Sequence, residues 1–412
     1  MLRGNREATR VEKHIIKKTD PYFKKLEEFC ILSKNLYNHA NYLVRQRFTK
    51  EGTWLRYEEM DRVLKADTEY PDYRAMPTAQ CAQQILRLLE KNWKSFFESI
   101  KDWNSHPEKY LGRPKLPKYL DKNGKYLLIL TNQNCRIKEG RVCFPKVFEG
   151  FSIKARFPAK NNFVSFQQVR LIPHRNRIVA ELVYTVKEEE QREQNGRYVG
   201  IDIGVNNLAA VCSNTGLPAF AINGRPLKSI NQYYNKKASH YRAVSKRMNR
   251  KDFTARLTRL TEKRNAKTED YMHKASRYIV DYCASNSIHT IVIGKNREWK
   301  QESPLSKKQN QHFVQIPFAR LIEMITYKAT EKGITVILTE ESYTSGTSFI
   351  DQEEPVKENY NKSRRIHRGL FMSDNGTGIN ADLNGAYQIL KKVFPVTWDR
   401  GCALHPVVVN MA

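Results

Sequence analysis

The sequence predicts an α/β fold in the C-terminal half of the chain, preceded by an α-helical module and a small β module. The stretch YVGIDIGVNNLAAV, residues 198–211, places one acid, Asp202, among apolar and β-branched residues, as in a strand buried on both faces. From residue 125 to residue 187 apolar residues alternate with polar ones, whereas earlier they recur at helical spacing. After residue 211, strand and helix patterns follow one another, which is typical of an α/β unit.

The charge balance indicates a polyanionic partner. Among the 412 residues, 71 are Lys or Arg and 43 are Asp or Glu, so the formal charge is +28. An excess this large favours nucleic acid over a generically basic surface, and the affinity should fall as salt rises. The length fits two or three domains.

The first residues and the cysteines indicate the compartment. MLRGNREATRVEK lacks the apolar core of a signal peptide, and no apolar run approaches a membrane span. The seven cysteines are odd in number and form no CxxC pair, so we interpret them as buried thiols in a reducing compartment. We therefore expect a cytoplasmic protein with no membrane partner.

The N-terminal part begins with a short basic segment, residues 1–19, which is expected to form one strand. Residues 20–120 follow as a helical module. Asp20 and Pro21 fit an N-cap and a first helical position. Apolar residues then recur at near-helical spacing for about seven turns, with basic residues on the other face.

Two further helices are expected in this module. One lies around Trp54 to Ala66, and Thr78 can cap the other after a proline. The aromatic residues of this last helix, which include Trp93 and Trp103, are interpreted as the core of a helical bundle rather than as a surface for base stacking.

A proline-rich segment, LGRPKLPKY at residues 111–119, follows the helices. Its prolines prevent regular structure, and its basic side chains are expected to point outward. Arg113, Lys115 and Lys118 are therefore candidates for phosphate contacts, and an ordinary solvated linker is the alternative.

Residues 121–190 are expected to form a small β-barrel or sandwich. CRIKEGRVCF indicates a hairpin with Glu139 and Gly140 at its tip, and VRLIPHRNRIVAELVYTV indicates a second hairpin that turns at residues 174–176. The acidic and polar run at residues 188–197 is interpreted as a linker to the strand of Asp202.

Residues 191–412 are expected to form the α/β unit. Two strands follow that of Asp202, and residues 228–285 then form a basic helical hairpin whose connection carries Lys246, Arg247 and Arg250. This hairpin is either a solvated strut or a brace for a duplex. Strand, helix, strand, insert and helix complete the order, which is that of a ribonuclease H-like fold.

Acidic residues recur where these later elements begin or end. The strand VILTEESYTS is expected to end in Glu340 and Glu341, and Asp382 opens the last helix, NADLNGAYQILKK. An unpaired buried carboxylate is costly, so Asp202 should have a cationic partner, most simply a metal ion. Together these acids could hold two Mg²⁺ ions, and such a pair of ions can catalyse the hydrolysis of a phosphodiester.

Five motifs in this order resemble those of the TnpB family: GIDIGVNNLAAV, IVIGKNREWKQES, QNQHFVQIPFARLIEMI, TEESYTSGTSFID and RRIHRGLFMSDNGTGINADLNGAYQIL. The match is close over residues 198–392 and looser before them. TnpB proteins are RNA-guided DNA endonucleases encoded by insertion sequences and related to miniature type V CRISPR effectors.

The resemblance implies a RuvC-like nuclease domain, residues 191–412, and a wedge-type β-barrel with an inserted helical recognition domain. It further implies a guide RNA, double-stranded target DNA beside a short target-adjacent motif, and two Mg²⁺ ions for which Mn²⁺ can substitute. A bacterial protein, associated with the nucleoid when bound to DNA, and a monomer or homodimer on the RNA follow from the same resemblance.

Carried over by position, the first catalytic and metal-binding acid is Asp202 and the last is Asp382. Many relatives place the middle glutamate on the strand that corresponds to IVIGKN, where this sequence has Asn296. Glu341 is the preferred middle acid because it is expected at the end of the next strand, and Glu340 and Glu298 are the alternatives.

The insert at residues 345–380 departs from the family. Relatives commonly carry a CxxC…CxxC zinc ribbon here, but this insert contains no cysteine, so zinc is not expected and a small β-hairpin could hold the segment instead. Its basic residues, including Arg364, Arg365 and Arg368, are candidates for nucleic-acid contacts, and a solvated loop is the alternative.

The sequence is also compatible with two other functions. A nuclease-inactive, RNA-guided DNA-binding regulator would keep the binding without cleavage, and a DDE-type transposase would act on transposon ends without RNA. GIDIG also opens the phosphate-binding strand of actin-like kinases, but the sequence has no second Gly-rich loop to complete an ATP site.

Overall fold

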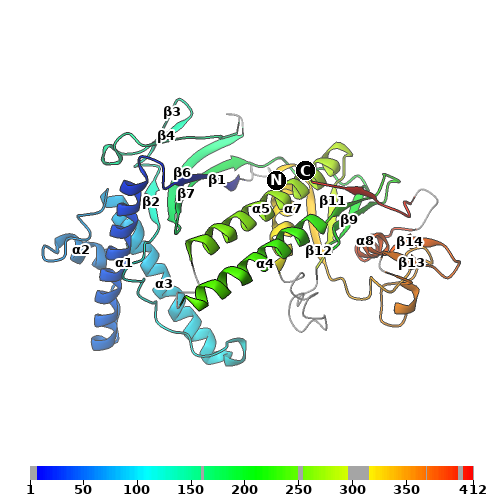
Figure 1. Cartoon of the computed structure of the whole chain (residues 1–412), viewed down its shortest axis with the longest axis horizontal. Coiled ribbons are helices and arrows are strands. Elements are labelled where there is room, and N and C mark those ends of the chain that lie inside the picture. The colour runs from blue at the N-terminus through cyan, green and yellow to red at the C-terminus, as the bar shows by residue number, and fades with distance from the viewer. Residues whose placement is uncertain are drawn as a thin grey trace. The chain divides into compact units, whose positions relative to one another are not determined.

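A computed structural model describes residues 7–158, 162–248, 254–295, 315–367, 369–397 and 402–411. The chain divides into two compact units, Met1–Lys187 and Glu188–Ala412, close to the boundary expected after residue 190 (Figure 1). Each unit has its own hydrophobic core.

Three helices form one half of the N-terminal unit: α1 (Phe23–Glu51), α2 (Tyr57–Ala66) and α3 (Ala79–Ser105). Thr78 caps α3 by accepting a hydrogen bond from the backbone of Cys81, as predicted. The side chain of Asp20 accepts instead from the backbone of Tyr22 in a turn before α1, so the predicted cap at Asp20 is wrong by two residues. Trp93 is fully buried, as predicted for the aromatic stripe, whereas Trp103 near the end of α3 is only half-buried.

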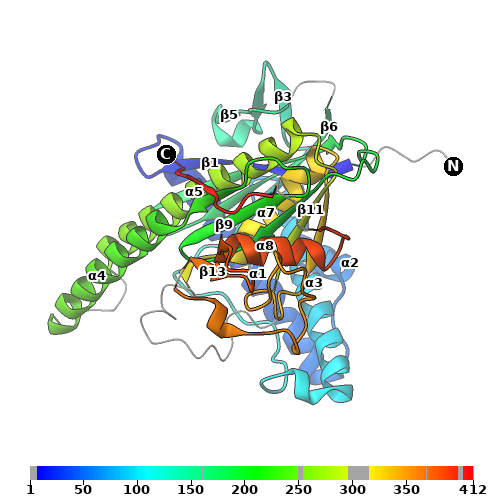
Figure 2. The same cartoon turned by 90° about the vertical axis from the view of Figure 1, so that its right-hand side faces the viewer.

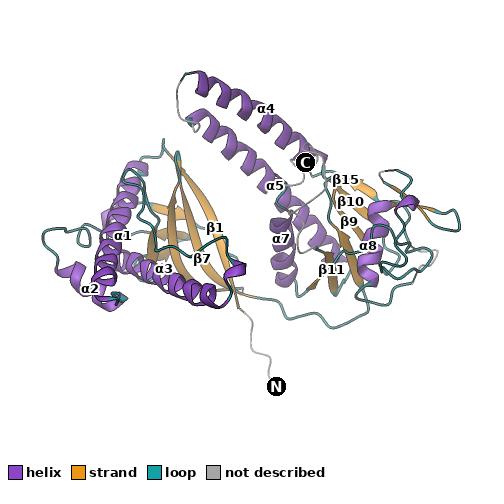
Figure 3. Cartoon of the chain, turned by 90° about the horizontal axis from the view of Figure 1, so that it is seen from below, coloured by secondary structure: helices purple, strands orange, loops and turns teal. Residues whose placement is uncertain are grey.

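Two sheets form the other half of this unit (Figure 3). The first is antiparallel in the order β1 (Glu7–Lys17), β7 (Arg177–Lys187), β6 (Phe163–Pro173) and β2 (Leu128–Thr131), and the second contains β3 (Arg136–Lys138), β4 (Arg141–Cys143) and β5 (Ser152–Lys154). Short 3₁₀ helices, η1 (Pro107–Lys109) and η2 (Lys146–Phe148), lie in the connections.

Both predicted hairpins are present. Glu139 and Gly140 have φ angles of 49° and 70°, which suit a tight turn between β3 and β4, and His174 begins the turn between β6 and β7. In the described part of the chain, however, the strand pairings form two open sheets rather than one closed barrel. Alternating residues specify strands, but closure depends on long-range pairing that the pattern does not encode.

A six-stranded sheet organises the C-terminal unit. Its order is β12 (Thr335–Thr339), β11 (Thr290–Gly294), β8 (Tyr198–Asp202), β9 (Asn207–Ser213), β10 (Phe220–Asn223) and β15 (Val407–Val409). Strands β8, β9 and β10 form an antiparallel meander, and β11 and β12 run parallel to β8. This arrangement is the one that the ribonuclease H-like prediction requires, and β15, parallel to β10, is an unpredicted addition.

Helices cover both faces of this sheet. Val199, Ile201 and Ile293 pack on the side of α5 (Ala255–Ser285) and α7 (Phe318–Glu331), whereas Cys212 and Val292 pack with α8 (Ala381–Lys391). Figure 2 shows α8 lying across the sheet. The near-continuous apolar strands follow from this two-sided burial.

The remaining elements are the partner of α5 and the insert. Helix α4 (Arg225–Arg247) pairs with α5 in the predicted hairpin. The insert contains the 3₁₀ helix η3 (Lys362–Arg364) and the antiparallel strands β13 (Leu370–Met372) and β14 (Gly378–Asn380), so the expected small hairpin is present.

Two chemical expectations also concern the fold. The seven cysteines are free thiols, of which five are buried. Within the described ranges, none of the helices combines the length and apolar character needed to span a membrane.

Candidate active site

The sheet brings two of the three predicted acids to one edge. Asp202 is the last residue of β8, and the parallel register pairs Ile201 of β8 with Ile293 of β11 and Gly294 of β11 with Thr339 of β12. Since parallel strands end at the same edge of a sheet, Glu341, two residues beyond β12, emerges at the same edge as Asp202, with β11 between their two strands. Strand β12 therefore ends at Thr339, two residues earlier than predicted. Glu341 nevertheless lies at the predicted edge of the sheet.

Helix α8 and β11 leave room for these two side chains because each has a glycine at the contact. A Cβ on Gly385 of α8 would lie 2.8 Å from Oδ2 of Asp202, and a Cβ on Gly294 would lie 2.7 Å from Oε1 of Glu341. Both distances are shorter than the contacts that Cβ atoms make in proteins. Any side chain at Gly385 or Gly294 would therefore displace a carboxylate.

The acids influence one another electrostatically. Burial raises the pKa of Asp202 well above its ordinary value, and the negative charges of Glu341 and Asp382 raise this pKa further. Arg365 opposes the shift. The ionised form of Asp202 is thus disfavoured in the fold, and a cation placed near it would restore that form.

Asp382 lies in the first turn of α8, as predicted. Asn380 caps the helix by accepting from the backbone of Asp382 and Leu383. One oxygen of Asp382 accepts a hydrogen bond from Asn207 at 2.8 Å, and the other pairs with Arg365 at 3.1 Å. The positive end of the helix dipole also favours the carboxylate here.

Glu341 and Glu340 differ in exposure and in contacts. Glu340 is exposed, whereas Glu341 is half-buried against Gly294 and affects the pKa of Asp202. Lys392, just after α8, donates hydrogen bonds to the backbone carbonyls of Glu340 and Ser342 at 2.9 and 2.7 Å, so it holds the turn that carries Glu341. Glu298 and Asn296 lie outside the described residues.

The donor set suits a hard divalent cation. Asp202, Glu341 and Asp382 offer carboxylate oxygens only, which Mg²⁺ prefers, and Arg365 shows that Asp382 accepts a cationic partner at this position. Among the residues that the structure describes, no three His, Cys, Asp or Glu side chains already form a group that could hold an ion. The acids therefore share one neighbourhood and fit the metal chemically, without enclosing a preformed site.

The predicted nucleic-acid contacts fall into two groups. Arg113, Lys115, Lys118, Lys246 and Arg247 are exposed. The backbone near the first three is fixed, because the carbonyl of Pro117 accepts hydrogen bonds from Asn41 and Arg45 of α1. Their contacts with nucleic acid stay predictions.

Arg364 and Arg365 form the second group, and both pair with carboxylates of the protein. Arg364 points into the insert, where its guanidinium meets three carboxylates, so its charge is neutralised within the protein. Arg365 points to Asp382. Arg250 and Arg368 lie outside the described residues.

Sequence reasoning missed Asn207 and Lys392 as supports of the acids. Asn207 follows the GIDIG motif in the run VNN, and Lys392 follows the last motif in the run LKK, but many surface residues have comparable surroundings in the sequence. Only the folded arrangement shows that each one contacts an acid or the turn that carries it.

Comparison with known families shows that parts of the chain are similar to one class of protein. A family model described as a probable transposase, OrfB_IS605, matches residues 181–300, and a model of the Cas12f1-like TNB domain matches residues 318–389. The first match contains the strand of Asp202, and the second contains Glu341 and Asp382. These matches confirm the resemblance to TnpB and to the miniature type V effectors.

Individual relatives agree with this class. The TnpB-like protein ORF457 of Acidianus two-tailed virus is 23% identical over 405 residues, which cover 90% of this chain and 84% of that protein. The CRISPR-associated endodeoxyribonuclease Cas12f2 of a Micrarchaeota archaeon (strain CG1_02_47_40) is 28% identical over 289 residues, covering 65% of this chain and 48% of the relative. This chain thus matches about half the length of Cas12f2.

A solved structure shows a shared fold. The cryo-EM structure of a Cas12f1–sgRNA–target DNA complex contains a chain that aligns with a TM-score of 0.55 at 16% identity, covering 89% of this chain and 82% of that one.

Proposed function

We propose that this chain is an RNA-guided DNA endonuclease of the TnpB family. The observation that carries the proposal is that segments far apart in the sequence bring Asp202, Glu341 and Asp382 into one electrostatic neighbourhood in a strongly basic chain. The relatives named TnpB-like protein and Cas12f2 support the same activity. Guide pairing would select the target, and the N-terminal unit would read the short target-adjacent motif.

In this proposal Asp202, Glu341 and Asp382 would hold two Mg²⁺ ions, for which Mn²⁺ could substitute. Such ions supply Lewis acidity for an in-line displacement at phosphorus. The protein residues orient the acids: Asn207 holds Asp382, Lys392 holds the turn of Glu341, and Gly385 lets Asp202 approach α8. Arg365 supplies a positive charge beside Asp382, where the phosphate would bind.

Purified protein with its co-purified RNA provides the test. The RNA is sequenced first, and a species with one constant and one variable end is expected from a guide. Cleavage of a matched DNA target is then measured with Mg²⁺ for the wild type and for Asp202→Ala, which should bind RNA but not cut DNA.

The other outcomes identify the alternative functions. If wild type and Asp202→Ala bind the matched target but are equally inert, the chain is a nuclease-inactive regulator. Activity of RNase-treated protein on transposon ends would instead indicate a DDE-type transposase.

A further inference from the structure

The insert at residues 345–380 has a cross-link that contains no metal. The zinc ribbon of the relatives does not fit here, because the insert has no cysteine and its single histidine, His367, is exposed. The insert packs Phe349, Phe371 and Ile379 into a core with α8, but η3 has no buried residue, so polar contacts must join η3 to the rest of the insert.

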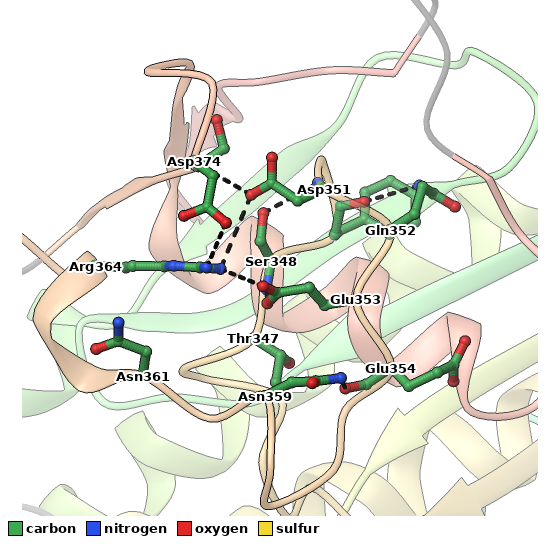
Figure 4. Close-up of polar contacts among 12 residues, drawn as sticks. Thr347, Ser348, Asp351, Gln352, Glu353, Glu354, Asn359, Asn361, Arg364 and Asp374 are labelled. Atoms are coloured by element: carbon green, nitrogen blue, oxygen red, sulfur yellow. Dashed lines mark hydrogen bonds and ion pairs between the residues drawn. The ribbon is translucent and has the colours of Figure 1, made fainter.

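Arg364, the last residue of η3, lies at the centre of the insert (Figure 4). Its guanidinium donates to Glu353 at 2.7 Å and to Asp374 at 2.6 Å, and Asp351 lies 3.9 Å away. The Arg364 side chain is 16% exposed. Burial alone would lower the pKa of Arg364, but the three carboxylates outweigh it and the net pKa is raised.

The carboxylates extend this cross-link to the backbone. Glu353 accepts a hydrogen bond from the backbone N–H of Ser348 at 2.7 Å, and Asp351 accepts from that of Asp374 at 2.9 Å. Charge-assisted bonds of this kind are the stronger ones in proteins. Three stretches of the insert, at residues 348–353, 364 and 374, are thereby joined through one side chain.

The joined insert also rests on the helix of Asp382. Asn384 of α8 accepts from the backbone of Phe349 and donates to the carbonyl of Thr347, and Lys391 donates to the carbonyl of Gln352 at 2.7 Å. These bonds fix the base of the insert against α8. Arg364 fixes the outer part, since η3 and the β13–β14 connection have no such bonds to α8 in the described residues.

The residue that follows Arg364 connects this cross-link to the candidate active site. Arg365 follows Arg364 directly, and its guanidinium reaches Asp382 instead of the insert. Anchoring Arg364 therefore fixes the backbone from which Arg365 extends. We propose that Arg364 replaces zinc as the cross-link of the insert and is the positioning residue for Arg365 at the active site; the second part rests on the proposed nuclease function.

The cross-link is tested by hydrogen exchange on the full-length chain. In Arg364→Met, exchange at the backbone amides of Ser348 and Asp374 should be about tenfold faster or more, the change expected when a charge-assisted hydrogen bond is lost. Glu353→Gln should accelerate exchange mainly at Ser348. The matched control Arg320→Met, which removes an arginine from an exposed pair with Glu323 on α7, should leave both amides unchanged. Unchanged exchange in Arg364→Met, with circular dichroism like that of the wild type, would overturn the cross-link.

The zinc content of the purified chain gives an independent test of the cross-link. The purified chain should contain substoichiometric zinc, and a zinc-selective chelator should not affect exchange in the insert. Stoichiometric zinc whose removal accelerates exchange at Ser348 and Asp374 would contradict the proposal.

The positioning role is tested by DNA cleavage with the RNA-bound protein. Arg364→Met should lower kcat about tenfold or more with little change in target affinity, because a misplaced catalytic neighbour affects the reaction rather than binding. Arg364→Lys should recover part of the rate, since lysine keeps the charge but not the planar fork. Faster exchange with unchanged cleavage would overturn the positioning role. An inert wild type would overturn the nuclease function and that role with it, whereas the exchange result would still decide the cross-link.

Discussion

The C-terminal unit contains two groups of three carboxylates, each with one arginine, and the two groups differ in how the arginine contacts the acids. Asp351, Glu353 and Asp374 surround Arg364, and two of them also accept backbone hydrogen bonds. In the group of Asp202, Glu341 and Asp382, Arg365 pairs with Asp382 at 3.1 Å, and the pKa of Asp202 is raised by burial and by its acidic neighbours.

The difference indicates which acids serve the fold and which serve the reaction. Carboxylates whose charge is balanced by the protein stabilise the structure, whereas a buried carboxylate whose acidic neighbours raise its pKa, such as Asp202, favours a cation from solution. Each group consists of two Asp, one Glu and one Arg, so the interaction partners rather than the residue types distinguish the groups.

The largest expected effect is on the rate of DNA cleavage, which should depend much more on the group of Asp202 than on the group around Arg364. Asp202→Asn should reduce DNA cleavage about a thousandfold or more, because it removes a metal-binding charge. Glu353→Gln should reduce it only severalfold, through the insert. Cleavage rates with Mg²⁺ check this, and equal losses in the two variants would remove the distinction.

The next effect concerns the middle acid. Glu341→Gln should lower the cleavage rate about a hundredfold, whereas Glu340→Gln should leave it within about twofold, since Glu340 is exposed and only Glu341 acts on Asp202. Single-turnover rates on a matched target provide the measurement. The assignment of Glu341 is wrong if Glu340→Gln alone abolishes cleavage.

A smaller effect is expected at the glycine beside Asp202. In Gly385→Ala the new Cβ would lie 2.8 Å from Oδ2 of Asp202, so the carboxylate must move and cleavage should fall about tenfold to a hundredfold. Overpacking should also reduce the free energy of unfolding by about 1–3 kcal/mol. Gly112→Ala, where the Cβ meets no atom within 4 Å, is the control for stability.

The smallest expected effect is on the free energy of unfolding, and its sign differs between the two groups of acids. Because the fold disfavours ionised Asp202, Asp202→Asn should stabilise the metal-free chain by about 1 kcal/mol at neutral pH. Glu353→Gln should destabilise it by about 1–2 kcal/mol, because it weakens bonds to Arg364 and Ser348. Chemical denaturation in the presence of EDTA measures both values, and a loss of stability in Asp202→Asn would contradict the electrostatic account.

Local signals predicted much of the fold. The Thr78 cap, the long amphipathic α1 and the Glu139–Gly140 turn each depend on residues within a few positions of one another, and the structure has all three. The same holds for Asp382 at the start of α8 and for the small hairpin in the insert.

Long-range arrangement was not predictable in the same way. The two open sheets of the N-terminal unit and the edge strand β15 depend on pairing between distant segments. Arg364 and Arg365 are identical neighbours in sequence, but one points into the insert and the other to Asp382. Chain composition gives no reason for that division.

Locating Mn²⁺ in the full-length chain tests the central claim most directly. Anomalous scattering from crystals grown with Mn²⁺ should show ions in contact with carboxylate oxygens of Asp202, Glu341 and Asp382. Ions bound elsewhere while these three acids stay unliganded would contradict the proposed active site.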